Sequence, residues 1–320
     1  LYLSTKSIDF RDLMKNLEDM QLEGTQIAAE EQSFTWKWRY IFTAILGTFL
    51  VIFLSFYFSG YGEAIDQWIG NLGSDFLIFL LVGFIAQMID GALGMAYGVS
   101  CSTLLLSFGI PPAASSASIH AAEVFTSGAS GLMHLKFKNV NLKLFKTLLL
   151  PGIIGAAVGA YILSSVVEEY TNILKPLIAL YTLYLGFVII RKGILGSKNN
   201  SKIKSIPALA AFGGCMDSIG GGGWGPIVSS TLIANGRNAR YTIGSVNLTE
   251  FFVALASSIT FFALIGLHHW QIIVGLILGG VVAAPIAAYL SSRLPVKKLM
   301  IVVGILICVV SIRIIAISVL

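Results

Sequence analysis

Two pairs of acidic residues lie in register, 127 positions apart, inside otherwise apolar stretches of the chain. Asp90 corresponds to Asp217, and Glu123 corresponds to Glu250. The chain has 16 acidic residues, and these four are the only ones within its apolar stretches. A carboxylate in a lipid bilayer is costly, so such a residue normally faces a cavity or the bundle interior and serves a function. A site repeated at one offset indicates two copies of one unit around a shared centre, the plan of a secondary transporter.

The composition places the chain among membrane proteins. Of its 320 residues, 56% are hydrophobic and 12% are charged, and the mean hydropathy is +0.84. Soluble domains carry about 25% charged residues. The net charge of +5 does not indicate nucleic-acid binding, because the basic residues lie in short loops; the lipid bilayer is the expected partner. The three cysteines all fall in apolar stretches, so a disulfide framework is not expected.

The N-terminal part is expected to precede the repeated units. Residues 1–35 fit an amphipathic helix, which would lie either on the membrane surface or in the cytosol. An extra transmembrane helix is expected at 36–59, entered through the aromatic residues Trp36, Trp38 and Tyr40.

The rest of the chain is predicted to be two transmembrane repeats. Repeat 1 covers 76–192 and repeat 2 covers 206–318, with a cytoplasmic linker at 193–205. Each is expected to hold a glycine-broken helical hairpin followed by three transmembrane helices, which makes the chain an all-α polytopic membrane protein. The expected pieces are 76–90, 99–109, 113–134, 145–165 and 173–191 in repeat 1, and 206–217, 227–236, 241–265, 271–291 and 298–318 in repeat 2.

Basic loops indicate how the repeats are oriented. Lys and Arg gather in cytoplasmic loops, and equivalent loops of the two repeats carry opposite signals. The basic loop at 136–146 corresponds to the uncharged 263–273, and the uncharged 109–113 corresponds to the basic 236–240. Inverted topology is therefore predicted, with the N-terminus cytoplasmic and the protein multi-pass in the cytoplasmic membrane. Inverted topology requires an odd number of membrane crossings in each repeat. Three helices plus either a re-entrant hairpin or two short spans satisfy this requirement.

A glycine-rich segment interrupts each broken hairpin; we call residues 90–98 the first tip and 217–226 the second tip. Consecutive glycines break helices, and irregular backbone at membrane depth is tolerated only around a cavity or inside protein. The short helices that follow present N-terminal N–H groups suited to an anion. The alternative is that these glycines only permit close helix packing. The candidate substrate-binding residues are Asp90, Gly94, Tyr97, Gly98, Ser102, Asp217, Gly221, Gly222, Gly223, Trp224, Gly225 and Ser229.

A second repeated motif pairs a polar residue with a glutamate three positions later. His120 precedes Glu123, and Asn247 precedes Glu250; at this spacing both groups share a helix face. A buried glutamate can carry a proton, and His120 adds a second titrating group. These four residues are candidates for proton coupling or gating. The alternative is that the glutamates cap broken backbone near the tips.

The sequence carries no recognisable catalytic or cofactor motif. It has no HExxH, no CxxC and no phosphate-binding loop. We therefore expect no enzymatic activity, no cofactor and no metal site.

Several short stretches resemble one known family. They are GALGMAYG at 91–98, PPA at 111–113, PGIIGAAVG at 151–159 and GGGGWGP at 220–226. Over about 76–318 the chain resembles the sulfite exporter TauE/SafE family of membrane transporters. That resemblance implies a permease for sulfur-containing anions such as sulfite and sulfonates, with a small oxyanion bound at the paired tips. The first tip is poorer in glycine than the family pattern, and the N-terminal helix and first span lie outside the family core.

Two functions follow from these features. The first is a proton-coupled transporter of a small sulfur-containing anion, with the tips holding the anion and the paired acids ordering the tips or carrying protons. The alternative is a cation or cation/proton exchanger, because carboxylates and carbonyls suit a hard cation. The absence of a basic residue in the intramembrane core favours the alternative, and the resemblance opposes it. The oligomeric state is open, and a homodimer is one candidate.

Overall fold

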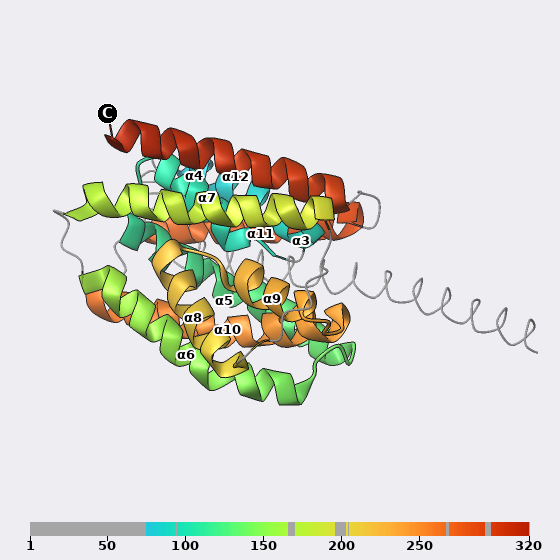
Figure 1. Cartoon of the computed structure of the whole chain (residues 1–320). Helices are drawn as coiled ribbons and strands as arrows, with labels where there is room; N and C mark the ends of the chain where they lie inside the picture. The colour runs from blue at the N-terminus through green and yellow to red at the C-terminus, as the bar shows by residue number, and fades with distance from the viewer. Residues whose placement is uncertain are drawn as a thin grey trace, which may run out of the picture. The chain divides into compact units, whose positions relative to one another are not determined.

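The computed structural model describes residues 75–93, 95–165, 170–195, 203, 205–266, 269–291 and 296–319. Every regular element among these residues is a helix, as the sequence predicted, and Figure 1 shows their arrangement. The expected segment 1–35, the expected first span at 36–59 and Gly94 lie outside the described residues.

The helices form two series that match at the offset of 127 residues. The first series is α3 (Asp75–Leu93), α4 (Tyr97–Ser107), α5 (Pro112–Lys136), α6 (Leu142–Ser165) and α7 (Thr171–Leu195). The second is α8 (Ile206–Gly220), the π-helix η3 (Gly225–Ser229), α9 (Ser230–Ala234), α10 (Ala239–Ile265), α11 (Trp270–Ser291) and α12 (Val296–Val319). These bounds lie within a few residues of the expected pieces.

Short polar residues mark where several helices begin. The Ser205 side chain accepts a hydrogen bond from the Ala208 N–H at the start of α8, and Asn238 accepts one from the Tyr241 N–H at the start of α10. Asn141 does the same for the Leu144 N–H of α6, at 3.0 Å. Such side chains satisfy N–H groups that a helix leaves unpaired in its first turn.

Four of the described helices are long and apolar enough to cross a membrane. They are Leu142–Ser165, Asn172–Leu195, Ala239–Ile265 and Lys297–Ser318. Large apolar side chains on these helices are exposed, including Leu150, Tyr184 and Val302. Extended exposed apolar surface of this kind is typical of proteins whose helices face lipid.

Helices from the two series pack as exchanged pairs. α3 packs along α11 and α8 packs along α6, while α5 pairs with α10 and α7 lies beside α12 (Figure 1). Both exchanged pairs approach closely at a glycine. A Cβ on Gly279 of α11 would lie 2.1 Å from the Leu80 carbonyl oxygen of α3, and one on Gly155 of α6 would lie 2.0 Å from the Ala211 carbonyl oxygen of α8. Small residues permit this close backbone packing between membrane helices.

Candidate functional site

The two tips lie against each other. A Cβ on Gly222 would lie 2.3 Å from both the Gly98 carbonyl carbon and the Val99 nitrogen, and one on Gly98 would lie 2.7 Å from Gly222 Cα. Three glycines of the second tip, Gly221, Gly222 and Gly223, have φ values of 66°, 149° and 151°, which side chains rarely tolerate. The glycine run therefore lets the second tip turn sharply and touch the backbone of the first.

The aspartates of the two tips make the same local hydrogen bond. The Tyr97 N–H donates to Asp90 Oδ1 at 3.3 Å, and the Trp224 N–H donates to Asp217 Oδ1 at 2.8 Å. In both helix series the donor lies where the short helical segment at the end of the tip begins. The carboxylate therefore occupies the first unpaired N–H group of that segment. An anion at either tip would have to use later N–H groups or side chains.

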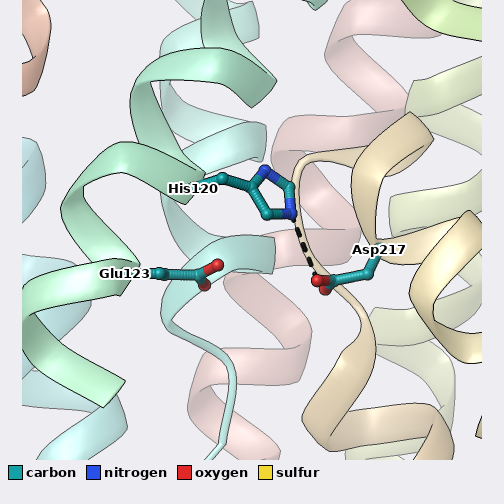
Figure 2. A group of neighbouring side chains, drawn as sticks. All are labelled: His120, Glu123 and Asp217. Atoms are coloured by element: carbon teal, nitrogen blue, oxygen red, sulfur yellow. Dashed lines mark hydrogen bonds and ion pairs between the residues drawn. The ribbon is translucent and has the colours of Figure 1, made fainter. Parts of the chain in front are cut away.

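Asp217 makes a second bond, which ties it to α5. Its Oδ2 lies 3.1 Å from His120 Nε2 (Figure 2). On the other side of the ring, His120 Nδ1 lies 2.8 Å from the Ser116 carbonyl oxygen. The Ser116 hydroxyl donates to the Ser218 carbonyl oxygen. Because both side chains of the pair are buried, α5 is joined to the second tip at two points within the protein interior.

Among the described residues, the equivalent side chains of the other helix series do not form such a link. Asn247, which corresponds to His120, donates to the Ser130 hydroxyl at 3.0 Å. The hydrogen bond of Asp90 among the described residues is the one from Tyr97. In the described part of the chain, no imidazole is bonded to the first tip.

A cavity of about 340 Å³ lies beside the first tip, between α3, α4, α5 and α10. Three of the four paired acids line it, and Asp217 does not. Glu123 is 4% exposed, and its Oε2 has no hydrogen-bond partner among the described residues. The full lining is Gln87, Asp90, Tyr97, Glu123, Thr126, Ser127, Ser130, His134, Ile243, Asn247 and Glu250.

Glu123 also stands next to the His120–Asp217 pair. One nitrogen or oxygen atom from each of the three residues lies within 4.8 Å of the others. In Figure 2 the carboxyl groups of Glu123 and Asp217 point toward each other from α5 and from the second tip. This group joins the cavity on one side to the bonded pair on the other, and its donor atoms suit a proton or a metal ion.

Several other candidate residues pack inside the protein, away from the cavity. The Ser102 hydroxyl donates to the Gly220 carbonyl oxygen at 2.6 Å. Trp224 is fully buried and its indole N–H donates to the Val246 carbonyl oxygen at 3.2 Å. Ser229 is buried, and a Cβ on Gly225 would lie 3.0 Å from Met95 Cβ. Trp224 therefore packs against α10, whereas Tyr97, its counterpart in the first tip, lines the cavity.

Sequence reasoning did not select three residues that contact the tips. Ser116 lies four positions before His120 and so shares its helix face, a signal that was available. The Tyr181 hydroxyl donates to the Gly222 carbonyl oxygen at 3.2 Å, and no sequence pattern predicts this contact. Lys192 Nζ lies 3.2 Å from the Ser230 hydroxyl and 3.3 Å from Met95 Sδ, because α7 continues beyond the expected helix end at 191.

Comparisons with known proteins agree on one family. The family described as "Sulfite exporter TauE/SafE" matches residues 79–314. The chain is 41% identical over 240 residues to "Probable membrane transporter protein YtnM" of Bacillus subtilis (strain 168), covering 71% of this chain and 78% of that protein. No solved structure matches the chain.

Proposed function

Since the chain belongs to the sulfite exporter TauE/SafE family and is a membrane transporter of that type, we propose that it carries a small sulfur-containing anion across the cytoplasmic membrane. Sulfite or an organosulfonate is the proposed substrate, and its movement is coupled to protons. The observation that supports this most is a polar cavity lined by Asp90, Glu123 and Glu250 beside two touching glycine tips. Small-molecule sites in transporters lie at such meetings of broken helices.

The two series of helices are proposed to be repeats of inverted topology. The exchanged pairing of α3 with α11 and of α8 with α6 is what two copies of one unit around a two-fold axis would produce. The opposite charges of equivalent loops, such as 109–113 and 236–240, support an axis in the membrane plane. In this arrangement the N-terminus is cytoplasmic, and the cavity end near His134 and Ile243 faces the cytoplasm.

The acidic lining of the cavity supports the proposed proton coupling. An ionised carboxylate repels an oxyanion a few ångströms away, whereas a protonated carboxyl group can donate a hydrogen bond to it. Glu123, with its unpaired Oε2, is proposed to bind a proton when the anion enters. The Ser130 hydroxyl and the second amide hydrogen of Asn247 supply further donors, whereas the hydroxyls of Thr126 and Ser127 donate to the Glu123 carbonyl oxygen.

The cation-exchange alternative is not favoured. Membership of a family described as sulfite exporters argues for an anion. The His120–Asp217 pair also removes one of the four carboxylates from any shared cation site.

Uptake into proteoliposomes tests the proposed substrate and coupling. Labelled sulfite and a panel of small sulfonates would be offered with and without an imposed pH gradient, with protein-free liposomes as the control. We expect saturable anion flux that responds to the gradient and falls sharply in Asp217→Asn. Movement of sodium or calcium, with no flux of any anion, would contradict the proposal.

A further inference from the structure

The hydrogen-bond partners of His120 fix the position of one of its protons. Nδ1 lies 2.8 Å from the Ser116 carbonyl oxygen, and a carbonyl oxygen only accepts. The Ser116 hydroxyl, 3.2 Å from Nδ1, gives its own proton to the Ser218 carbonyl oxygen. Nδ1 therefore faces acceptors only and must carry a hydrogen.

This assignment leaves a conflict at the other ring nitrogen. A neutral imidazole has one N–H, and in His120 it is on Nδ1. The lone pair of Nε2 would then point at Asp217 Oδ2, 3.1 Å away, and two acceptors at hydrogen-bond distance repel each other. A cation has to lie between them, and 3.1 Å is an ordinary distance for one shared hydrogen.

We infer that a single proton shared by His120 Nε2 and Asp217 Oδ2 latches α5 to the second tip, and that Glu123 is the group through which this proton exchanges with the cavity. The inference rests on the proposed proton coupling and gives the coupled proton a location. The pair holds one proton either as imidazolium with carboxylate or as imidazole with carboxylic acid.

Glu123 provides the route out of the pair. It lies within 4.8 Å of both partners and lines the cavity, and its buried Oε2 has no hydrogen-bond partner in the described part of the chain. The proton leaves Nε2 or Oδ2, binds Glu123 Oε2 and passes to cavity water. The other titratable groups near these three come from four helices: Asp90 on α3, Tyr97 and Cys101 on α4, Tyr181 on α7 and Glu250 on α10.

Loss of the proton would act directly on the second tip. Asp217 Oδ1 still binds the Trp224 N–H, so the carboxylate stays with the tip while its repulsion from Nε2 pushes α5 away. The first tip has no such control, because Asn247 is bound to Ser130 and cannot be protonated. One proton therefore controls the attachment of the second tip to α5 and leaves the first tip unchanged.

Solid-state NMR of histidine labelled with ¹⁵N in lipid-embedded protein tests the shared proton without any substrate. His120→Asn, which copies the residue of the other repeat, identifies the His120 signals. We expect Nδ1 protonated and Nε2 either protonated or strongly hydrogen-bonded to Asp217. A neutral ring protonated only on Nε2 would overturn the inference. So would stoichiometric zinc or manganese, found by elemental analysis and lost in His120→Asn, because the cation would then be a metal.

Flux measurements in the same variant separate the latch from the proposed function. His120→Asn should lose uptake driven by a pH gradient but keep exchange of labelled for unlabelled anion, since the cavity is intact. Normal gradient-driven uptake in this variant would overturn the latch. If the wild-type protein moves no anion at all while NMR still finds the shared proton, the proposed substrate fails and the latch stands.

Discussion

The two glycine tips share a register and a backbone hydrogen bond, yet they differ in their surroundings. At the second tip, Asp217 is buried against His120 and Trp224 is fully enclosed. At the first tip, Asp90 is half-buried and opens on the cavity with Tyr97. The same hydrogen-bonded tip therefore has two roles. The first tip forms a wall of the polar cavity, and the second tip is bonded to α5.

The backbone of the tips differs as well. Ala96 of the first tip has φ of 97°, and the equivalent position in the second tip is Gly223, with φ of 151°. A side chain in the left-handed region costs about 1 kcal/mol. The backbone of the first tip is therefore strained at Ala96. The second tip has glycine at the equivalent position and is not strained there.

Removing each aspartate is the strongest way to break the comparison. Asp217→Ala leaves His120 Nε2 and the Trp224 N–H without their partner, and we expect it to destabilise the protein by about 3–5 kcal/mol, as for a broken buried ion pair. Asp90→Ala loses one hydrogen bond beside a cavity that water can enter, and should cost about 1 kcal/mol. Denaturation of the two variants in detergent measures the difference. Equal losses would mean that the pair with His120 does not stabilise the second tip.

Crowding the contact between the tips should have the next largest effect. Gly222→Ala places a methyl group 2.3 Å from backbone atoms of Gly98 and Val99, and we expect a loss of about 3 kcal/mol. Gly236→Ala is the matched control, because its φ of 83° is also positive but no atom lies within 4 Å of the added carbon. Its cost should be about 1 kcal/mol. Similar thermal shifts for both variants would show that the tips do not touch.

The aromatic residues that follow the aspartates give a smaller contrast. Trp224→Phe loses the bond to the Val246 carbonyl oxygen and leaves a void, at a cost of about 2 kcal/mol. Tyr97→Phe loses a 3.5 Å contact with the Leu276 carbonyl oxygen, so its cost should be below about 0.5 kcal/mol. Thermal unfolding compares the two, and a larger effect at Tyr97 would reverse the assignment of the locked tip.

The smallest expected effect sharpens the backbone comparison. Ala96→Gly relieves the left-handed alanine but adds chain entropy to the unfolded state, so we expect a net gain of about 0.5 kcal/mol. Gly223→Ala should instead destabilise, since its Cβ would lie 2.0 Å from the Tyr181 hydroxyl oxygen. The unfolding midpoints of the two variants measure these effects. Destabilisation by Ala96→Gly would contradict the claim that the backbone of the first tip is strained at Ala96.

The sequence predicted the helices better than it predicted the site. Apolar run lengths and glycine breaks placed α3 to α12 closely, because helix propensity and hydrophobicity are local properties. The register of the acids indicated that Asp90, Glu123, Asp217 and Glu250 belong to matched units. Matching positions alone cannot distinguish the two units. They therefore did not show that Asp90, Glu123 and Glu250 line the cavity whereas Asp217 does not.

The missing information is three-dimensional. His120 and Asn247 differ visibly in the sequence, but only the fold brings His120 from α5 to an aspartate 97 positions later. The sequence also did not show that the aspartates accept hydrogen bonds from the Tyr97 and Trp224 N–H groups, which leaves only other groups at the helix N-termini for an anion. Tyr181 contacts the second tip from α7 and belongs to no motif.

Chemical labelling of carboxyl groups tests the division between the tips most directly. A water-soluble carbodiimide with an amine nucleophile would be applied to protein in lipid, and the four acids would be followed by peptide mass spectrometry. Asp90 and Glu250, which line the cavity, should be modified much faster than Asp217, which is buried and bonded at both oxygens. Modification of Asp217 at the same rate as Asp90 would contradict the account, because both tips would then open to water alike.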